Sequence, residues 1–358
     1  MPIAMMLALM LGWQDAEAQA LAAQAQAIEA VEPAAQAAPP QEAGPQQAGP
    51  QSGPVETLPG TAKLPAIAGG RITQMMFTDG AAAGVGEVWV WTPPSYGKDP
   101  RARFPVLYMH DGQNLFDPAY TNYGKEWGID EAIMRMAARG DLREWIVVGI
   151  RSPESRWLSL FPEKLLDYLP AHRQQALAAT VGYERLEREA FRGDDYLDWL
   201  VHRLKPYIDR RYPTHADAAN TAVMGSSMGG LMSLYAVAEY PQVFGQGAGL
   251  STHFALGNPI EDEAQVPAHV ADMVAAWDAY LDSTHIDPEF NMLYIDHGTA
   301  TLDAGYVPYY EAFAAMMRSG GWRDTHFESR RFKGAEHDED GWRERVDIPL
   351  SFLDRFDP

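Results

Sequence analysis

Gly225-Ser226-Ser227-Met228-Gly229 fits the pattern Gly-x-Ser-x-Gly with Ser227 at its centre. A strand-like run, residues 220–224, precedes it, and a helical run, residues 231–240, follows. A serine at such a strand–turn–helix junction has a crowded backbone, and small flanking residues give it room. The N–H groups and dipole at the start of the helix favour developing negative charge. We therefore interpret Ser227 as a nucleophile; the alternative is a small-residue turn that only packs.

A nucleophilic serine on this turn is followed along the chain by an acid and then by a histidine. Of the ten histidines, His337 is the best placed, since it follows a strand-like stretch, residues 325–332, and precedes the last helical segment. A loop histidine there can act as general base. Two alternatives are an exposed histidine in an acidic cluster and a divalent cation site over residues 336–340, although no EF-hand spacing is present.

The acid has two candidates. Residues 290–296 have the pattern of a buried strand, and residues 297–303 that of the loop after it. Asp303 is preferred because a loop carboxylate can reach the outer nitrogen of His337 and fix its tautomer. Asp296 lies closer to the strand end and is the second candidate. It also remains open that neither orients the histidine strongly.

Acyl transfer further requires two hydrogen-bond donors for the oxyanion. One is the backbone N–H of Met228, the residue after the nucleophile. The second is expected from a loop after an early strand, and residues 104–109 with the loop 110–117 fit that description. Gly112 would let the backbone approach the substrate, which leaves the N–H of Gln113 as the second donor.

Several further motifs occur in a consistent order. They are residues 108–117, 128–132, 146–150, 193–196, 204–209, 224–230 and 336–338, with Trp342-Arg343. Together they resemble the "putative esterase" family of α/β-hydrolases, which includes enterochelin esterases, feruloyl and acetyl-xylan esterases, S-formylglutathione hydrolase and bacterial mycolyltransferases. The resemblance covers residues 70–357 and implies Ser227 as nucleophile and His337 as base. It implies the third residue less strongly, because family members vary in that loop.

The stretch over residues 152–192 is long for a connection between a strand and a helix. Connections of this length tend to be lids or binding loops. We interpret it as a partly helical cap over the serine, with aromatic residues that suit a ring-containing acyl or alcohol group or that pack on the core. Where relatives often show Arg…Glu-Tyr-x-Pro, this chain has Arg156-Trp-Leu-Ser-Leu-Phe-Pro162, so the resemblance does not imply a substrate.

From residue 71 onward, apolar strand patterns alternate with helical patterns. The expected strands are residues 71–78, 87–92, 104–109, 145–150, 221–224, 246–250, 292–296 and 326–332, and the expected helices are 128–138, 196–211, 231–240, 267–281, 309–318 and 341–356. The first two strands are expected at an antiparallel edge and the others in a parallel sheet with helices on both faces. This predicts an α/β-hydrolase fold, with the site beyond the carboxyl ends of the strands.

The N-terminal part differs from the rest. Residues 1–20 contain an apolar run and then small residues, as in a secretion signal, but lack a basic start. Residues 21–68 are rich in Ala, Gln and Pro and are interpreted as a disordered linker. The catalytic domain is expected over residues 69–358. A periplasmic or secreted location is favoured and a cytoplasmic one is the alternative; the absence of cysteine does not decide between them.

The formal net charge is −21, which argues against nucleic-acid binding, and no segment suggests stable membrane insertion. The favoured function is a serine carboxylic-ester hydrolase that acts through an acyl-enzyme on a small-molecule or polysaccharide-linked ester. No cofactor and no metal are expected. The alternatives are acyl transfer to a sugar or lipid hydroxyl, and a non-catalytic carbohydrate- or siderophore-binding module on the same scaffold.

Overall fold

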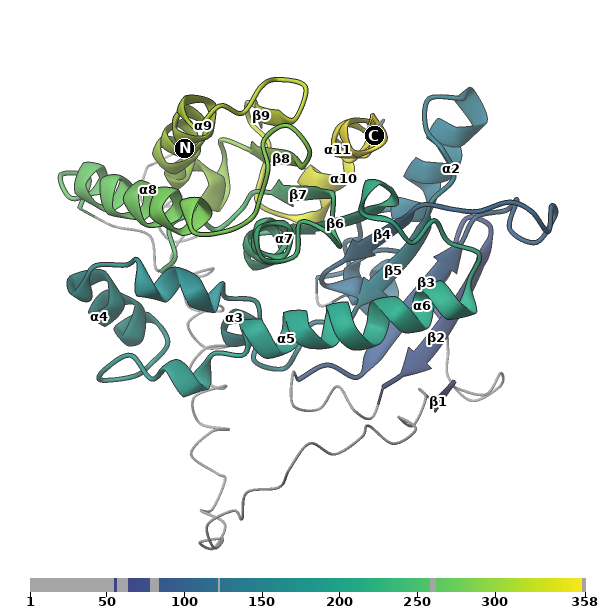
Figure 1. The fold of residues 1–358 in the computed structure, drawn as a ribbon, viewed down its shortest axis with the longest axis horizontal. Coiled ribbons are helices and arrows are strands. Elements are labelled where there is room, and N and C mark those ends of the chain that lie inside the picture. Colours follow the sequence, from purple (N-terminus) through teal and green to yellow (C-terminus); the bar gives the residue numbers. More distant parts are fainter. Residues whose placement is uncertain (1–54, 57–63, 78–83, 122, 258–261, 356–358) are drawn as a thin grey trace, which may run out of the picture.

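The computed structural model describes residues 55–56, 64–77, 84–121, 123–257 and 262–355 (Figure 1). The predicted secretion signal therefore lies outside the described residues, as does most of the predicted linker. Within that linker, Val55–Glu56 form strand β1, which pairs with β2. The N–H of Ala66 donates to the carboxylate of Asp117 at 2.8 Å. The described structure of the domain thus begins before residue 69.

A single sheet of nine strands forms the centre of the described domain. The strands are β1 (Val55–Glu56), β2 (Arg71–Met76), β3 (Glu87–Thr92), β4 (Val106–Met109), β5 (Ile146–Ile150), β6 (Thr221–Ser226), β7 (Gln246–Leu250), β8 (Met292–His297) and β9 (Phe327–Arg331). All eight expected strands are confirmed to within two residues at either end, and β1 is additional.

The strand order is β1-β2-β3-β5-β4-β6-β7-β8-β9. Strands β1, β2, β3 and β5 pair antiparallel, and all pairs from β5 to β9 are parallel. The chain therefore reverses its direction of progress across the sheet beside β4. Ligands of open α/β sheets bind at such a reversal, beyond the carboxyl ends of the strands. With helices on both faces, this is the expected α/β-hydrolase fold.

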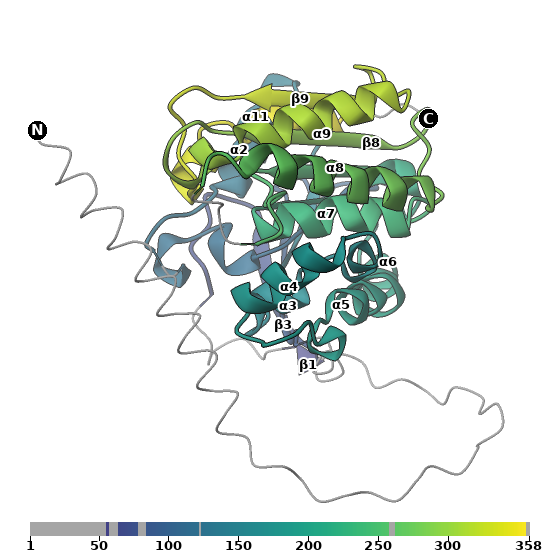
Figure 2. The same ribbon diagram turned by 90° about the vertical axis from the view of Figure 1, so that its left-hand side faces the viewer.

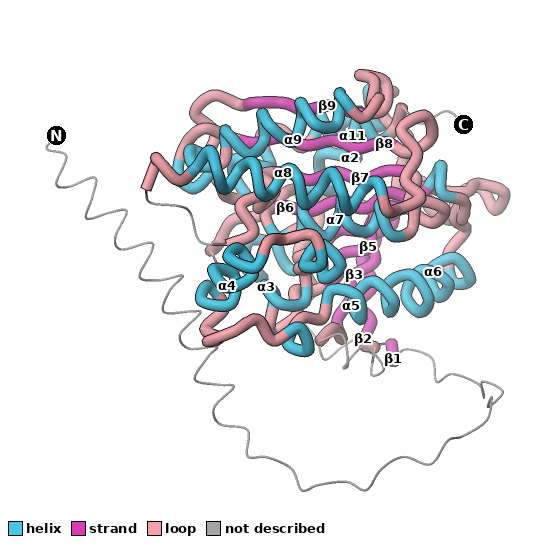
Figure 3. The backbone as a smooth tube through the Cα atoms, turned by 60° about the vertical axis from the view of Figure 1, so that its left-hand side comes forward, coloured by secondary structure: helices cyan, strands magenta, loops and turns pink. Residues whose placement is uncertain are grey.

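Side chains alternate between two cores along each strand because successive residues of a strand point to opposite faces. In β4, Val106 and Tyr108 contribute to one core, and Leu107 and Met109 to the other. Figure 3 shows the strands stacked from β9 to β1 with helices crossing in front. Both faces are covered, which explains why the inner strands carry continuous apolar runs.

Helices cover both faces of the sheet. They are α2 (Ile129–Arg139), α3 (Arg156–Ser159), α4 (Ala171–Thr180), α5 (Gly193–Trp199), α6 (Lys205–Arg211), α7 (Met228–Glu239), α8 (Val266–Asp282), α9 (Val307–Ser319), α10 (Glu339–Arg343) and α11 (Asp347–Leu353). In Figure 2, α7, α8 and α9 lie on the near side of β8 and β9, and α2 and α11 lie behind. None of the helices in the described ranges combines the length and apolarity needed to cross a membrane.

Two expected helices are interrupted. A π-helical turn over Leu200–Leu204 joins α5 to α6, and Pro206, which has no N–H to donate, lies two residues after its end. The expected helix over 341–356 is divided into α10 and α11. Pro349 lies in the first turn of α11, where a missing N–H is tolerated but a continuous helix is not.

The predicted cap is partly helical. It contains α3, α4 and the short 3-10 turns Glu163–Asp167 and Arg188–Ala190. Its buried apolar side chains belong to the core on the α7 face; they include Leu160, Phe161, Leu165, Leu166 and Leu177. The segment is therefore part of the domain core, and Figure 2 shows α3 and α4 beside α5.

Candidate active site

Ser227 lies between β6 and α7 with φ 54° and ψ −117°. A positive φ is unusual for a residue other than glycine and marks backbone strain. Two hydrogen bonds join it to the end of β7 and the loop that follows: its N–H donates to the carbonyl of Leu250 at 2.9 Å, and its carbonyl accepts from the N–H of His253 at 3.2 Å. The predicted turn is thus fixed against the loop that follows β7.

The glycines around Ser227 are required by close packing. A Cβ on Gly225 would lie 2.8 Å from the carbonyl carbon of Gly229. A Cβ on Gly230 would lie 2.6 Å from Thr252 Oγ1. Larger residues at these positions would push α7 away from the strand end and from the loop after β7.

Met228 is the first residue of α7. The first N–H groups of a helix have no intrahelical acceptor, so they are available to a ligand at the helix start. Its side chain is buried in the core on the α7 face. Packing therefore fixes the backbone of the residue expected to supply the first oxyanion donor.

The loop after β4 lies against the same turn. A Cβ on Gly229 would lie 3.1 Å from Cβ of His110. The Gln113 side chain is held by Ser152: its Oε1 accepts the Ser152 N–H at 3.0 Å, and its Nε2 donates to Oγ at 2.7 Å. Gly112 packs on the end of β5, where a Cβ would lie 2.4 Å from the carbonyl carbon of Gly149. Its small size thus allows close approach to the end of β5.

An ion pair that sequence analysis missed joins this loop to the cap. Arg156 Nε and Nη2 donate to the two carboxylate oxygens of Asp111 at 2.8 and 2.7 Å. Arg156 Nη2 also donates to the carbonyl of Ser226 at 3.3 Å. Burial opposes ionisation of Asp111, but Arg156 outweighs it and the pKa of Asp111 is lowered. Arg156 thereby connects the cap, the loop after β4 and the serine turn.

Asp303 and His337 are brought together. His337 Nδ1 lies 2.7 Å from Asp303 Oδ1, and the Asp303 side chain is fully buried. Burial opposes ionisation, but hydrogen bonds, first from His337 and then from Ser251 and Gly298, lower the pKa of Asp303. An ionised carboxylate can only accept, so the His337 Nδ1 carries the proton. This tautomer leaves Nε2 of the neutral ring able to accept a proton.

Asp296 has a different partner. Its Oδ1 accepts from Arg345 Nε at 3.0 Å, and its Oδ2 accepts from the Tyr294 hydroxyl at 3.0 Å. Burial raises the pKa of Asp296, although Arg345 opposes this. Asp296 lies on β8 and belongs to a buried ion pair, whereas Asp303 lies on the short turn Thr301–Gly305.

His253, whose N–H donates to the Ser227 carbonyl, is a second histidine near the serine turn. Its Nδ1 forms a hydrogen bond with the Tyr306 hydroxyl. Its ring packs edge-to-face against the Trp157 ring, with the two ring centroids 5.8 Å apart. Burial, then nearby His337, lowers the pKa of His253 to about 3, so the ring is neutral at physiological pH. The half-buried Trp157 of the cap therefore stands next to the residue that contacts the Ser227 backbone.

The acidic residues after His337 are engaged in other contacts. Lys125 Nζ contacts carboxylates of Asp338 at 2.5 Å and of Asp340 at 3.0 Å. Glu339 accepts from the Asn114 side chain at 2.9 Å. Within the described ranges, His, Asp and Glu side chains form no group of three suited to a metal ion.

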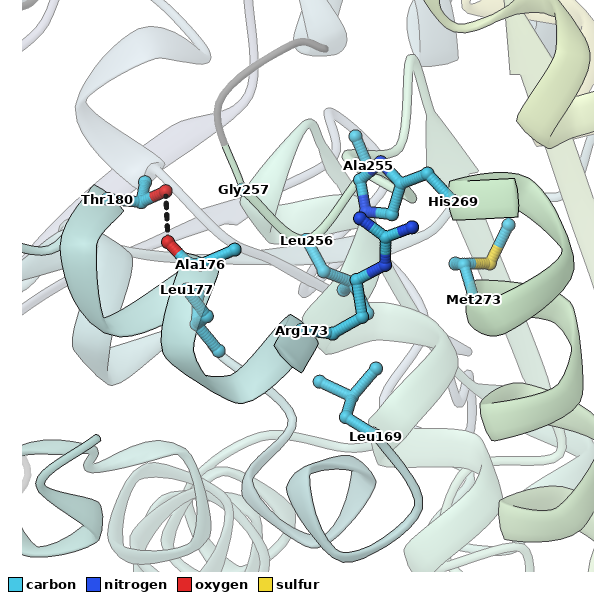
Figure 4. Close-up of a pocket in the computed structure, with 10 residues that line it drawn as sticks. All are labelled: Leu169, Arg173, Ala176, Leu177, Thr180, Ala255, Leu256, Gly257, His269 and Met273. Carbon is cyan, nitrogen blue, oxygen red and sulfur yellow. Dashed lines mark hydrogen bonds between the residues drawn. The ribbon is translucent and has the colours of Figure 1, made fainter. Parts of the chain in front are cut away.

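A pocket lies beside the loop after β7 (Figure 4). Arg173 is paired with Asp272 at 2.7 Å, and the Nδ1 of His269 lies 2.7 Å from the Tyr309 hydroxyl. The pocket lies between α4, α8 and that loop; its lining residues are Leu169, Arg173, Ala176, Leu177, Thr180, Ala255, Leu256, Gly257, His269 and Met273. The loop after β7 thus contacts Ser227 through His253 and, two residues later, lines a pocket that has both apolar and polar walls.

A family model described as "Putative esterase" matches residues 86–345. The match includes the segments that carry Ser227, Asp303 and His337 and leaves out the N-terminal part. It covers most of the chain, from just before β3 to the end of α10.

Individual relatives are more distant. The chain is 28% identical over 154 residues to the siderophore triacetylfusarinine C esterase of Aspergillus fumigatus, covering 43% of this chain and 44% of that protein. It is 24% identical over 200 residues to an endo-1,4-beta-xylanase/feruloyl esterase of Xylanibacter ruminicola, covering 55% and 24%. A solved ferulic acid esterase shares the fold, with a TM-score of 0.53 and 18% identity over 80% of this chain and 98% of that one. The chain spans less than two thirds of the curated relatives' length.

Proposed function

This chain belongs to the "Putative esterase" family, and from that premise we propose that it is a carboxylic-ester hydrolase with Ser227, His337 and Asp303 as its catalytic triad. The observation that carries the triad is the buried hydrogen bond between Asp303 and His337, 2.7 Å long. It is supported by the strained backbone of Ser227 at the start of α7. No cofactor takes part in the proposed reaction.

In the first half-reaction, His337 Nε2 takes the proton of the Ser227 hydroxyl while its oxygen attacks the ester carbonyl carbon. The tetrahedral intermediate carries its negative charge on the former carbonyl oxygen. His337 then gives the proton to the leaving alkoxide, the C–O bond breaks, and the acyl group remains on Ser227. Asp303 holds the Nδ1 proton and stabilises the imidazolium that forms.

The oxyanion is bound by the N–H groups of Met228 and Gln113 in this proposal. Both backbones are held before substrate arrives, Met228 by the packing of α7 and Gln113 by its side-chain hydrogen bonds to Ser152. Donors that need no rearrangement stabilise developing charge most effectively. The ion pair of Arg156 and Asp111 keeps the loop with Gln113 beside the turn with Met228.

In the second half-reaction, water replaces the alcohol. His337 removes a proton from water, the resulting hydroxide attacks the acyl carbon, and the Ser227 oxygen leaves with that proton. The products are a carboxylic acid and an alcohol. Supplying a second alcohol during turnover tests this assignment: a hydrolase yields mainly the free acid, whereas a mainly transesterified product would indicate an acyltransferase.

We propose that the substrate carries a bulky, largely apolar group. Two of the relatives named above are, by their names, a siderophore esterase and a feruloyl esterase. In this chain, Trp157 packs against His253, whose N–H donates to the Ser227 carbonyl, and the pocket of Figure 4, with its apolar and polar walls, follows along the same loop. These features provide apolar contact area away from the reacting carbonyl.

Trp157→Ala should raise KM for bulky aryl esters about tenfold and leave kcat for p-nitrophenyl acetate nearly unchanged, since it removes binding that ground and transition states share. Steady-state kinetics on a matched pair of esters, acetyl and feruloyl, measure the effect. Trp322→Ala, which removes a tryptophan that packs against Phe327 on β9, is the matched control. Equal losses on both esters would show that Trp157 supports catalytic geometry and does not bind substrate.

A further inference from the structure

Ser251 is a buried serine that immediately follows β7 and has a positive φ of 44°. Its hydroxyl makes three contacts at once. Oγ lies 3.0 Å from Nε1 of Trp342, 2.9 Å from Nη2 of Arg345 and 2.6 Å from Oδ2 of Asp303. The proposed mechanism does not use this hydroxyl.

The chemistry of the neighbours determines which way the hydroxyl points. An indole N–H and a guanidinium can donate but cannot accept, so Trp342 and Arg345 both donate to Oγ. A hydroxyl has two acceptor positions and one proton, and the two donors fill both acceptor positions. The proton must then be directed at Asp303, the remaining contact.

We propose that Ser251 is a positioning residue for the triad: Trp342 and Arg345 orient its hydroxyl so that it holds one oxygen of Asp303 and reserves the other for His337. This inference rests on the proposed function, since it assigns Asp303 and His337 to the triad. Ser251 touches no reacting atom and acts only through Asp303.

The contacts of Asp303 support this division between its oxygens. Oδ2 accepts from Ser251 Oγ and also from the Gly298 N–H at 2.5 Å, whereas Oδ1 faces His337 Nδ1. A carboxylate with both donors on one oxygen cannot rotate without breaking both hydrogen bonds. The second oxygen is thereby kept in line with the His337 ring.

Arg345 is itself held in place. Its Nε donates to Asp296 at 3.0 Å and its Nη1 to the Gly341 carbonyl at 2.8 Å. Asp296, the other acid considered from the sequence, therefore lies two contacts away from Ser251, through Arg345, and four away from His337. The titratable groups that interact with Asp303 are His337, Asp296, His297 and Tyr310, and the Arg345 guanidinium lies one hydrogen bond further away, on Ser251.

Ser251→Ala is expected to lower kcat about 10- to 100-fold, the factor that one hydrogen bond to a charged group represents. It should also move the acidic limb of the pH–rate profile to higher pH. The hydroxyl proton is a partial positive charge beside the carboxylate, and without it the site favours the protonated His337 ring over a wider pH range. A role confined to folding would not move this limb.

Three further variants make the test specific. Ser251→Cys keeps a weak donor and should give an intermediate loss. The Trp342 ring lies 5.3 Å from that of His337. Trp342→Phe keeps an aromatic ring but removes one donor to Oγ, so it should shift the acidic limb less than Ser251→Ala does. Thr221→Val removes a buried hydroxyl that donates to the backbone carbonyl of Asp217. Thr221 begins β6, at the end of the strand far from Ser227, so this variant should leave the profile unchanged.

A readout without substrate separates this inference from the proposed function. Proton NMR should show a low-field Nδ1–H signal of His337, assigned by its loss in His337→Gln, and this signal should move upfield or broaden in Ser251→Ala. An unchanged signal and an unchanged acidic limb would overturn the positioning role, whether or not kcat falls. If the wild-type protein hydrolyses no ester, the proposed function fails, yet the signal still decides the role of Ser251.

Discussion

Ser227→Ala should lower kcat for p-nitrophenyl acetate about 10⁴- to 10⁶-fold, because removing a triad nucleophile leaves only binding and oxyanion contacts to assist attack by water. The thermal midpoint should stay within a few degrees of wild type or rise, since alanine keeps the small size that the turn requires. The Ser227 backbone is strained at φ 54°, and the substitution neither adds bulk nor removes a described side-chain hydrogen bond. Steady-state kinetics and a thermal unfolding scan measure both quantities.

Ser226→Ala is the matched control for Ser227→Ala. Ser226 is the last residue of β6, and its carbonyl, which alanine retains, accepts from Arg156. Loss of its buried hydroxyl should change kcat less than about tenfold. If Ser227→Ala retained most of the activity while Ser226→Ala lost it, the wrong serine of the pair would have been assigned.

Asp303→Asn is expected to lower kcat about 10³- to 10⁴-fold through the tautomer of His337. The donors Ser251 and Gly298 meet one carboxylate oxygen, so they would select the amide oxygen of asparagine at that position. The amide NH₂ would then face His337 Nδ1, which could only accept. The ring proton would move to Nε2, and the base would no longer be able to take the proton of Ser227.

Asp296→Asn provides the contrast. It leaves Arg345, which is almost fully buried, without a charged partner, and breaking a buried pair costs about 3–5 kcal/mol of stability. The main effect should therefore appear in chemical denaturation, and kcat of the folded protein should fall much less than in Asp303→Asn. A larger loss of kcat at Asp296 than at Asp303, compared at equal folded fraction, would reverse the assignment of the acid.

Much of the fold could be predicted from local pattern. Strands such as β6 and β8 are continuous apolar runs bounded by polar residues, and the glycines at 225 and 230 are dictated by contacts close to them in the chain or at the neighbouring strand end. The order of serine, acid and histidine also follows the chain. These features depend on periodicity and spacing, which a sequence displays directly.

Other features depend on contacts between distant segments. Arg156 and Asp111 are 45 residues apart, and Ser251 and Arg345 are 94 apart, so neither contact leaves a local pattern. One signal was available: Ser251 directly follows a strand that ends at the same rim as Ser227. The choice between Asp296 and Asp303 likewise could not be made from the sequence, because it depends on Arg345, a distant residue that pairs with Asp296.

The division of the last expected helix illustrates a third kind of difference. The apolar pattern over residues 341–356 continues through α10 and α11, so periodicity alone predicts a single helix. The helix is nevertheless divided, because Pro349 has no backbone N–H to donate to the preceding turn. The break lets α10 present Trp342 to Ser251 and His337 while α11 packs against β7 and β8.

The most direct test of the central claim is covalent labelling with a fluorophosphonate, followed by peptide mass spectrometry. The account predicts one adduct, on Ser227, formed rapidly by wild type and much more slowly by His337→Gln, because the hydroxyl attacks phosphorus only when a base removes its proton. Ser227→Ala should remain unlabelled. An adduct on another serine, or ester hydrolysis by a protein that the probe does not label, would contradict the assignment of Ser227 as the nucleophile.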